Sequence, residues 1–188
     1  VGPDDSITVR FTPPRAGTFM YHSHFNEDHQ INSGLHGAIV VLEPGERMDP
    51  ETDRVLLFSS AGPTINLING PYTPTQLNGQ LRPPPMELRA GTTYRFRLIN
   101  ITGDVNTIVT LLDGEKPVEW RAVAKDGATL PEAQRVTRPA TVFFNPGEIY
   151  DFELTPLKAG TLTLRFGPPP SPRGCGMPAQ VTVPVHVR

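Results

Sequence analysis

Cysteine is almost missing from this 188-residue sequence, which contains only Cys175. A single cysteine excludes an internal disulfide and every zinc or iron–sulfur site that takes several cysteines. A blue-copper site needs a cysteine flanked by histidines, but the nearest of the five histidines, His186, lies eleven residues beyond Cys175. We therefore expect Cys175 to be an ordinary residue of a loop or a strand edge.

Long apolar runs and an excess of one charge are missing as well. No stretch reaches the roughly 18 consecutive apolar residues of a transmembrane helix. The net charge is only −2, and charged residues make up 19% of the chain, which provides neither a basic face for nucleic acid nor an acidic tail. Residues 1–5 do not form a signal peptide, so secretion cannot be read from them. Helix signals are limited to single turns at 26–30 and 133–136.

Proline and glycine are abundant instead, with 22 and 17 residues scattered between short apolar runs. This punctuation is typical of many short strands joined by turns. The sequence predicts an all-β protein, with strands at 6–11, 18–22, 35–42, 55–59, 93–100, 108–112, 118–124, 141–144, 149–154, 161–166 and 181–187. The dipeptides Asp113-Gly114 and Asp126-Gly127 are expected to form turns. In the strand at 93–100, Tyr94, Phe96 and Leu98 share one face, while Arg95 and Arg97 share the other.

The strands divide into two unequal groups. The three strands within residues 1–45 are too few to close a β-sandwich. We interpret these residues as the C-terminal part of a domain whose first half lies elsewhere, with unpaired strand edges and an exposed apolar face. Residues 44–52 look like a linker. Residues 46–188 hold about eight strands, which is enough for one complete Greek-key β-sandwich.

The most specific segment is Gly17–His24, which reads G-T-F-M-Y-H-S-H. On an extended strand, side chains two residues apart point to the same face, so we expect His22 and His24 to lie side by side. Neutral imidazoles placed in this way are suitable metal ligands, and copper is one of the metals that they favour. The segment is followed by Gln30 and by Gly34–Val41, which reads G-L-H-G-A-I-V-V.

These residues resemble the G-T-(F/Y)-W-Y-H-S-H…Q…G-L-x-G-x-(L/I)-(V/I)-V stretch of the multicopper oxidases, the laccase-like enzymes. Residues 77–79 (L-N-G) and 91–100 (ending Y-R-F-R-L-I-N) resemble a copper-free, cupredoxin-like domain of the same family. The resemblance implies cupredoxin-like Greek-key sandwiches and a multicopper oxidase. Such an enzyme oxidises small reductants, which are phenols, aromatic amines or metal ions, and reduces O2 to water at a trinuclear copper cluster. It also implies a periplasmic or secreted location.

The resemblance implies that His22 and His24 each bind a different copper of the type 3 pair, with no catalytic residue beyond the metal ligands. The cluster of the family takes eight histidines, and this chain matches two of them. The His-Trp-His-Gly motif and the His-Cys-His…Met element are absent from the sequence. The type 1 copper is therefore expected outside this chain. The missing histidines are expected from an upstream part of the same protein or from a neighbouring chain.

Several alternatives stay open at this stage. His36 stands where the family usually has an aromatic residue, and it either packs there or adds a ligand. His29 is either a solvated loop residue or a ligand, and Glu27 with Asp28 is either a charged surface loop or a proton relay. The chain as a whole could also be a non-catalytic cupredoxin-like fragment with weak or no metal binding. A relative of the copper nitrite reductases is a third reading, although their cysteine motif is absent.

Overall fold

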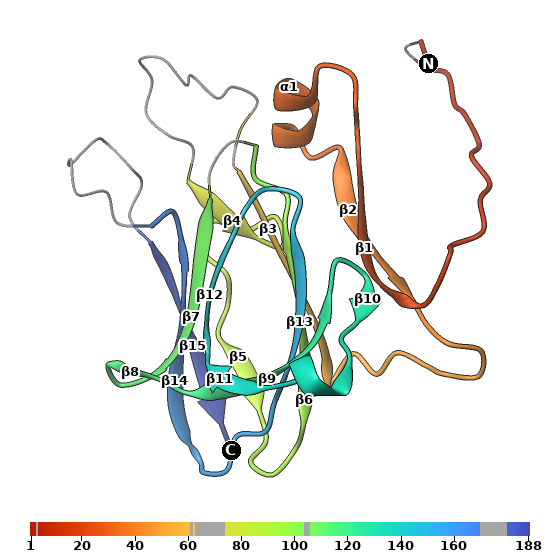
Figure 1. Ribbon diagram of the computed structural model, residues 1–188. Helices are drawn as coiled ribbons and strands as arrows, with labels where there is room; N and C mark the ends of the chain where they lie inside the picture. The colour runs from red at the N-terminus through yellow and green to blue at the C-terminus, as the bar shows by residue number, and fades with distance from the viewer. Residues whose placement is uncertain (3, 61, 63–73, 104–105, 170–179) are drawn as a thin grey trace.

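The structure is a computed structural model, and it describes residues 1–2, 4–60, 62, 74–103, 106–169 and 180–188. Cys175 and the expectation attached to it lie outside these residues. None of the helices in the described part of the chain has the length and apolar character needed to cross a membrane. The chain forms a hairpin that stands beside a larger β-sandwich (Figure 1).

The hairpin consists of β1 (Gly17–His22) and β2 (His36–Val41), which pair in antiparallel fashion. The register places His22 opposite His36. A short helix, α1 (Glu27–Asn32), caps the connection between the two strands (Figure 1). The strands predicted at 18–22 and 35–42 are confirmed, and the possible helical turn at 26–30 is α1.

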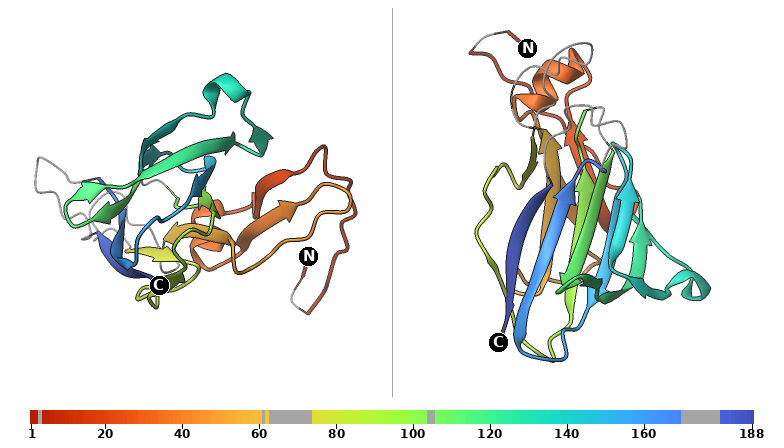
Figure 2. Two further views of the ribbon diagram at one scale, coloured as in Figure 1. Left: turned by 90° about the horizontal axis from the view of Figure 1, so that it is seen from below. Right: turned by 90° about the vertical axis from the view of Figure 1, so that its left-hand side faces the viewer.

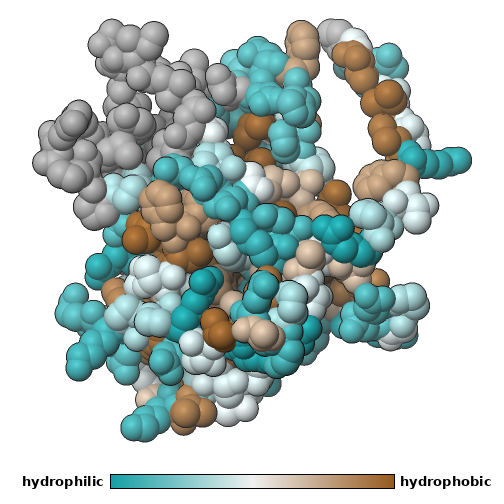
Figure 3. Space-filling view, viewed as in Figure 1, coloured by the Kyte–Doolittle hydropathy of each residue, from teal (hydrophilic) through white to brown (hydrophobic). Residues whose placement is uncertain are grey.

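The strand predicted at 6–11 is wrong. Residues 6–11 carry no strand assignment and pair with no strand of the described residues. Their alternating apolar side chains are instead exposed, Ile7 by 71%, Val9 by 71% and Phe11 by 68%. Figure 3 shows apolar atoms along this N-terminal segment, which runs apart from the sandwich. Alternation of apolar and polar residues indicates only which side chains could share a buried face. A β-strand also needs a neighbouring strand to which its backbone is hydrogen-bonded, and residues 6–11 have none among the described residues.

The sandwich is built from two mixed sheets (Figure 2). The first sheet contains β3 (Asp53–Ser60), β4 (Thr75–Leu77), β6 (Tyr94–Asn100), β9 (Glu119–Lys125), β10 (Ala128–Thr129), β11 (Thr137–Pro139) and β13 (Ile149–Leu154). The second contains β5 (Met86–Leu88), β7 (Thr107–Asp113), β8 (Lys116–Pro117), β12 (Thr141–Phe144), β14 (Gly160–Gly167) and β15 (Val181–Val187). One 3-10 turn, η1 (Glu132–Gln134), lies close to the turn expected at 133–136. The prediction of an all-β sandwich is confirmed.

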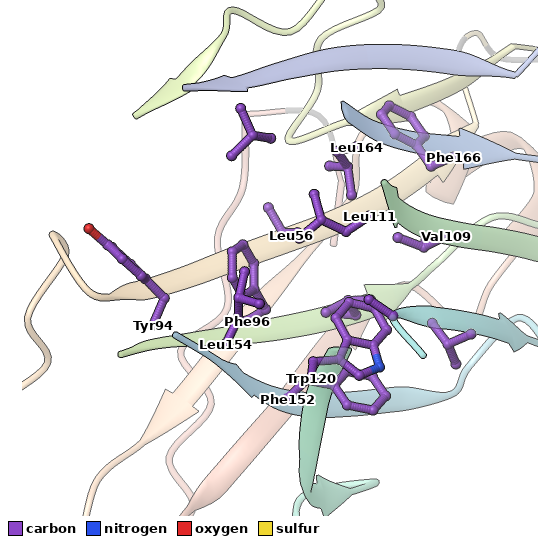
Figure 4. Close-up of a cluster of buried hydrophobic side chains, with 14 of the residues drawn as sticks. Leu56, Tyr94, Phe96, Val109, Leu111, Trp120, Phe152, Leu154, Leu164 and Phe166 are labelled. Carbon is purple, nitrogen blue, oxygen red and sulfur yellow. The ribbon is translucent and has the colours of Figure 1, made fainter. Parts of the chain in front are cut away.

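Aromatic side chains fill the space between the sheets (Figure 4). Trp120 of β9 stacks on Phe152 of β13, with ring centroids 4.0 Å apart. Phe58 meets Phe166 of the opposite sheet edge-on, at 5.2 Å. Such ring pairs add to the free energy gained by removing apolar surface from water. The core therefore holds the sandwich as a rigid support for the hairpin.

A buried ion cluster joins the hairpin to the sandwich, and it consists of Thr18, Asp53, Arg95, Arg97 and Asp151. The Asp151 carboxylate accepts hydrogen bonds from Thr18 Oγ1 (2.9 Å), Arg97 Nη1 (3.1 Å) and Arg95 Nη2 (2.7 Å). Arg97 also donates to Thr18 (2.8 Å) and to Asp53 (2.6 Å). Only 1% of the Asp151 side chain and 4% of the Arg97 side chain are exposed. This cluster fixes β1 four residues before His22.

A second contact fixes the hairpin at the turn Asp126-Gly127, where both residues have positive φ, as expected for this sequence. Arg15 donates from Nε to the Gly127 carbonyl at 2.9 Å. The neighbouring Lys125 binds Glu148 at 2.8 Å. Burial acts to lower the pKa of Lys125, but hydrogen bonds to Glu148 and Asp126 outweigh it and hold that pKa above its ordinary value. The ion pair therefore stays charged at neutral pH and braces the turn.

The close fit at this turn predicts a large effect of Gly127→Ala. A Cβ at Gly127 would lie 2.8 Å from Cδ1 of Phe19, and the φ of +70° disfavours a side chain. The strained backbone and the overpacking together are expected to cost about 2–5 kcal/mol of unfolding free energy, measured in urea. Gly114→Ala is the matched control, since Gly114 has a φ of +59° with nothing within 4 Å. It is expected to cost only about 1–2 kcal/mol. Equal losses in the two variants would show that the hairpin does not dock here.

Candidate metal centre

The two predicted metal ligands lie together at the open end of the hairpin. His22 is the last residue of β1, and His24 follows in the connection to α1. Their ring centroids are 5.6 Å apart and the rings are tilted by 33°. The docked strand β1 holds the first ring, and the chain leaving the strand brings the second beside it. The structure thus brings together the residues that the sequence pattern singled out.

Both rings are held through the same nitrogen. Nδ1 of His22 lies 2.8 Å from the backbone oxygen of Ser23, and Nδ1 of His24 contacts the carboxylate of Glu27. A carbonyl or carboxylate oxygen only accepts hydrogen bonds, so each neutral ring carries its proton on Nδ1. Nε2, which then bears the free lone pair, has no partner among the described residues. Histidines that bind metals commonly show this arrangement, in which the nitrogen not bound to the metal donates to an oxygen.

Helix α1 and the turn before it shape the connection that follows the two histidines. Asn26 adopts the left-handed conformation (φ 49°, ψ 55°), which asparagine tolerates better than most residues. The chain turns sharply there, so that the helix runs back beside the histidines. Ser23 Oγ contacts the side chain of Gln30 and donates to the backbone oxygen of Phe25 at 3.2 Å. Gln30, part of the sequence pattern, therefore ties the helix to the histidine pair.

The other two histidines of this region have different surroundings. His36 lies opposite His22 across the hairpin, but its Nδ1 donates to the backbone oxygen of Ile31 at 2.8 Å. That bond attaches β2 to α1, as a packing role would require. His29 lies on α1 and is exposed. Among the described residues, no group of three or more His, Cys, Asp or Glu side chains could hold a metal ion.

The histidine pair lies on an open surface. Two cavities, of about 710 Å³ and 640 Å³, are lined by residues of 50–94 with Arg188 and of 93–162 respectively. Neither cavity includes a residue of the hairpin. The side chain of His24 is 87% exposed. Two imidazoles on an open surface do not enclose a metal ion, so an enclosed metal site here would require more protein on this side of the hairpin.

The sequence reasoning did not identify two residues that support the pair. The sequence offers Glu27, with Asp28, as a charged surface loop or a proton relay, and the structure places it at His24. Asp151 received no role, although its carboxylate is the centre of the cluster that holds β1. The contact with Thr18 spans 133 residues, and no local pattern signals a contact of that kind. The one usable signal in the sequence was an acid only three residues after His24, close enough to contact it once Asn26 turns the chain.

Comparison with known proteins agrees with the sequence pattern. Residues 1–46 match a family model described as multicopper oxidase. A laccase of Trametes maxima is 31% identical over 124 residues, which cover 56% of this chain and 24% of the relative. Laccase-2 of Fomitopsis schrenkii is 34% identical over 116 residues, covering 53% of this chain and 22% of the relative. The chain thus corresponds to about a quarter of the length of these relatives.

Solved structures with the same architecture come from multicopper oxidases. The McoA multicopper oxidase of Aquifex aeolicus superposes with a TM-score of 0.74 at 20% identity, covering 92% of this chain and 41% of that one. Fet3p, a multicopper oxidase that functions in iron import, gives a TM-score of 0.71 at 18% identity, covering 92% and 34%. These likenesses establish the cupredoxin-like fold. Over the parts that match, the chain is therefore similar in sequence to laccases and in fold to multicopper oxidases.

Proposed function

We propose that this chain supplies two ligands, His22 and His24, to the trinuclear copper cluster of a multicopper oxidase. The observation that carries the proposal is the pair of adjacent imidazoles, each with Nδ1 engaged by an oxygen and Nε2 unoccupied by any described residue. Neutral imidazole nitrogens are suitable copper ligands. When bound, the cluster would transfer electrons from small reductants, which are phenols, aromatic amines or metal ions, to O2 and release water.

The role of the chain is to hold the two imidazoles in place. Each Nε2 would bind a different copper of the type 3 pair, and the docking of β1 on the sandwich would keep the two nitrogens apart at a fixed spacing. In the multicopper oxidase family that this chain resembles, eight histidines bind the cluster. The remaining six, and the type 1 copper, are proposed to come from the rest of the polypeptide or from a neighbouring chain. The exposed position of His24 supports this, because a second protein surface is needed to enclose the metal.

The two-part organisation of the chain fits this role. We propose that residues 1–45 are the end of a copper-binding cupredoxin domain and that residues 46–188 are a second domain without copper. The exposed apolar side chains of Ile7, Val9 and Phe11 support the first part, since a partner surface would bury them. A periplasmic or secreted location is proposed on the likeness to laccases.

A second candidate is a non-catalytic fragment with weak or no metal binding. The observation that favours it is the small number of ligands. Among the described residues, His22 and His24 are the two histidines whose rings lie side by side, and the side chain of His24 is exposed to solvent. Two histidine ligands are too few for the isolated chain to retain three copper ions during desalting.

Copper content and O2 uptake test the proposal. The 188-residue chain, loaded with copper and desalted, is expected to retain less than one copper by elemental analysis. The intact oxidase, which supplies the other histidines, is expected to retain its cluster and to consume O2 when a phenol is added. An intact protein that retains copper but consumes no O2 with any of the three reductant classes would contradict the oxidase function. Two or more coppers on the isolated chain would show that the ligand set named here is incomplete.

A further inference from the structure

We propose that Glu27 is a positioning residue for His24, and that its carboxylate decides which imidazole nitrogen faces the metal. The inference rests on the proposed function for the identity of the metal. The orientation of the ring follows from contacts within this chain. Glu27 would touch neither copper nor O2, and it would act only through His24.

The contact between Nδ1 of His24 and Oε1 of Glu27 carries the inference. A carboxylate accepts and cannot donate, so it keeps the proton on Nδ1 and leaves the lone pair on Nε2. The His24 side chain is 87% exposed and that of Glu27 is 40% exposed. Among the described residues, the His24 ring has no other hydrogen bond or ion pair, and its one ring neighbour is His22 at 5.6 Å. Without Glu27, the imidazole would rotate freely and exchange its tautomers.

The backbone that carries Glu27 is itself well anchored. Gln30 of α1 donates its backbone N–H to Asn26, just before the helix, at 3.0 Å, and it accepts from Leu35, just after the helix, at 2.9 Å. Ile31 is buried, and its carbonyl accepts the hydrogen bond from His36. The left-handed Asn26 sets the direction in which the helix starts. Glu27 is therefore placed by a fixed turn and does not reach His24 from a free loop.

The two histidines are held by different kinds of group. A backbone carbonyl, that of Ser23, accepts from His22, and almost any side chain at position 23 would leave it in place. His24 depends on a side chain, which a single substitution removes. A carboxylate behind an imidazole also makes the opposite nitrogen a stronger donor to a metal. Glu27 is thus the residue through which the chain would adjust the affinity of His24 for copper.

Nitrogen NMR of the metal-free chain tests the orientation directly. At pH 8, where histidine is ordinarily neutral, two-bond ¹⁵N–¹H couplings report which nitrogen of His24 carries the proton. The Nδ1–H form is expected in the unaltered chain, and a mixture of both forms in Glu27→Ala. Glu27→Gln retains an oxygen acceptor and is expected to keep most of the Nδ1–H form. Glu115→Ala is the control, because it removes the same charge from an exposed turn residue and is expected to change nothing.

Copper retention by the intact oxidase tests the consequence. In competition with a copper chelator, Glu27→Ala is expected to lose about 10–100-fold in affinity at the type 3 pair, and Glu115→Ala is expected to lose none. An unchanged tautomer in Glu27→Ala would overturn the inference, and so would a changed tautomer with unchanged copper affinity. If the tautomer changes but the unaltered oxidase takes up no copper at all, the proposed function fails and the hydrogen-bonding role of Glu27 is upheld.

Discussion

Replacing Asp151 with alanine is expected to lower the free energy of unfolding by about 3–5 kcal/mol. The Asp151 carboxylate receives hydrogen bonds from Arg95, Arg97 and Thr18, and only 1% of its side chain is exposed. Its removal leaves the Arg97 guanidinium, 4% exposed, with only Asp53 as a charged partner. A buried charge that loses its partner is far more costly than a surface charge that does so. Urea unfolding followed by tryptophan fluorescence measures the loss, since Trp120 lies in the core.

Two further variants show whether the loss of stability in Asp151→Ala comes from the burial of an unpaired charge. Glu132→Ala breaks a pair with Arg121 whose side chains are 76% and 37% exposed, and it is expected to cost less than about 1 kcal/mol. The double variant Arg97→Met with Asp151→Leu removes both buried charges and is expected to recover most of the loss. A loss from Asp151→Ala as small as that from Glu132→Ala would refute the structural importance of the buried ion cluster.

In the intact protein, which we propose to be an oxidase, His22→Ala and His24→Ala are each expected to abolish O2 consumption and to remove copper from the proposed type 3 pair. Each substitution deletes a proposed ligand outright, so the effect should exceed the roughly 10–100-fold loss that follows from removing an outer-shell partner. The blue colour should remain, because the type 1 copper is proposed to lie outside this chain. Copper analysis, visible absorption and O2 electrode traces on the same samples check all three statements.

His29→Ala is the control within the same loop. His29 is exposed on α1, and its replacement is expected to leave copper content and O2 consumption unchanged. Loss of the blue colour in His22→Ala or His24→Ala, in parallel with the loss of O2 consumption, would count against the ligand assignment. Full activity in either variant would disprove it.

The strands of the sandwich could be predicted because their signals are local. Residues 141–144, 149–154 and 181–187 form strands with the predicted bounds, since apolar alternation there coincides with burial between two sheets. Tyr94, Phe96 and Leu98 are buried as a face. The proximity of His22 and His24 was predictable from their spacing at the end of a strand, whereas their role as metal ligands stays a prediction.

Two of the remaining features depend on contacts that no local pattern reports, and a third depends on the direction of one turn. Arg97 lies on the polar face of its strand, yet it is buried, because the hairpin covers that face and supplies Thr18 to it. Residues 6–11 show the opposite case, in which alternation without a partner strand leaves apolar groups exposed. Glu27 reaches His24 only because Asn26 turns the chain into a helix. For Arg97 and for residues 6–11 the missing knowledge was which surface another segment would cover, and for Glu27 it was the direction of the chain at Asn26.

The order of folding follows from where the hairpin is anchored. The strands β1 and β2 pair within 25 residues of sequence, from Gly17 to Val41, so this pairing closes a short loop and can form early. The bond from Thr18 to Asp151 spans 133 residues, and contacts across such separations are slow to form. It also needs β6 and β13 to be paired already, because Arg97 and Asp151 come from these strands. The histidines would thus acquire their final orientation in the last stage of folding, after β6 and β13 of the sandwich have paired.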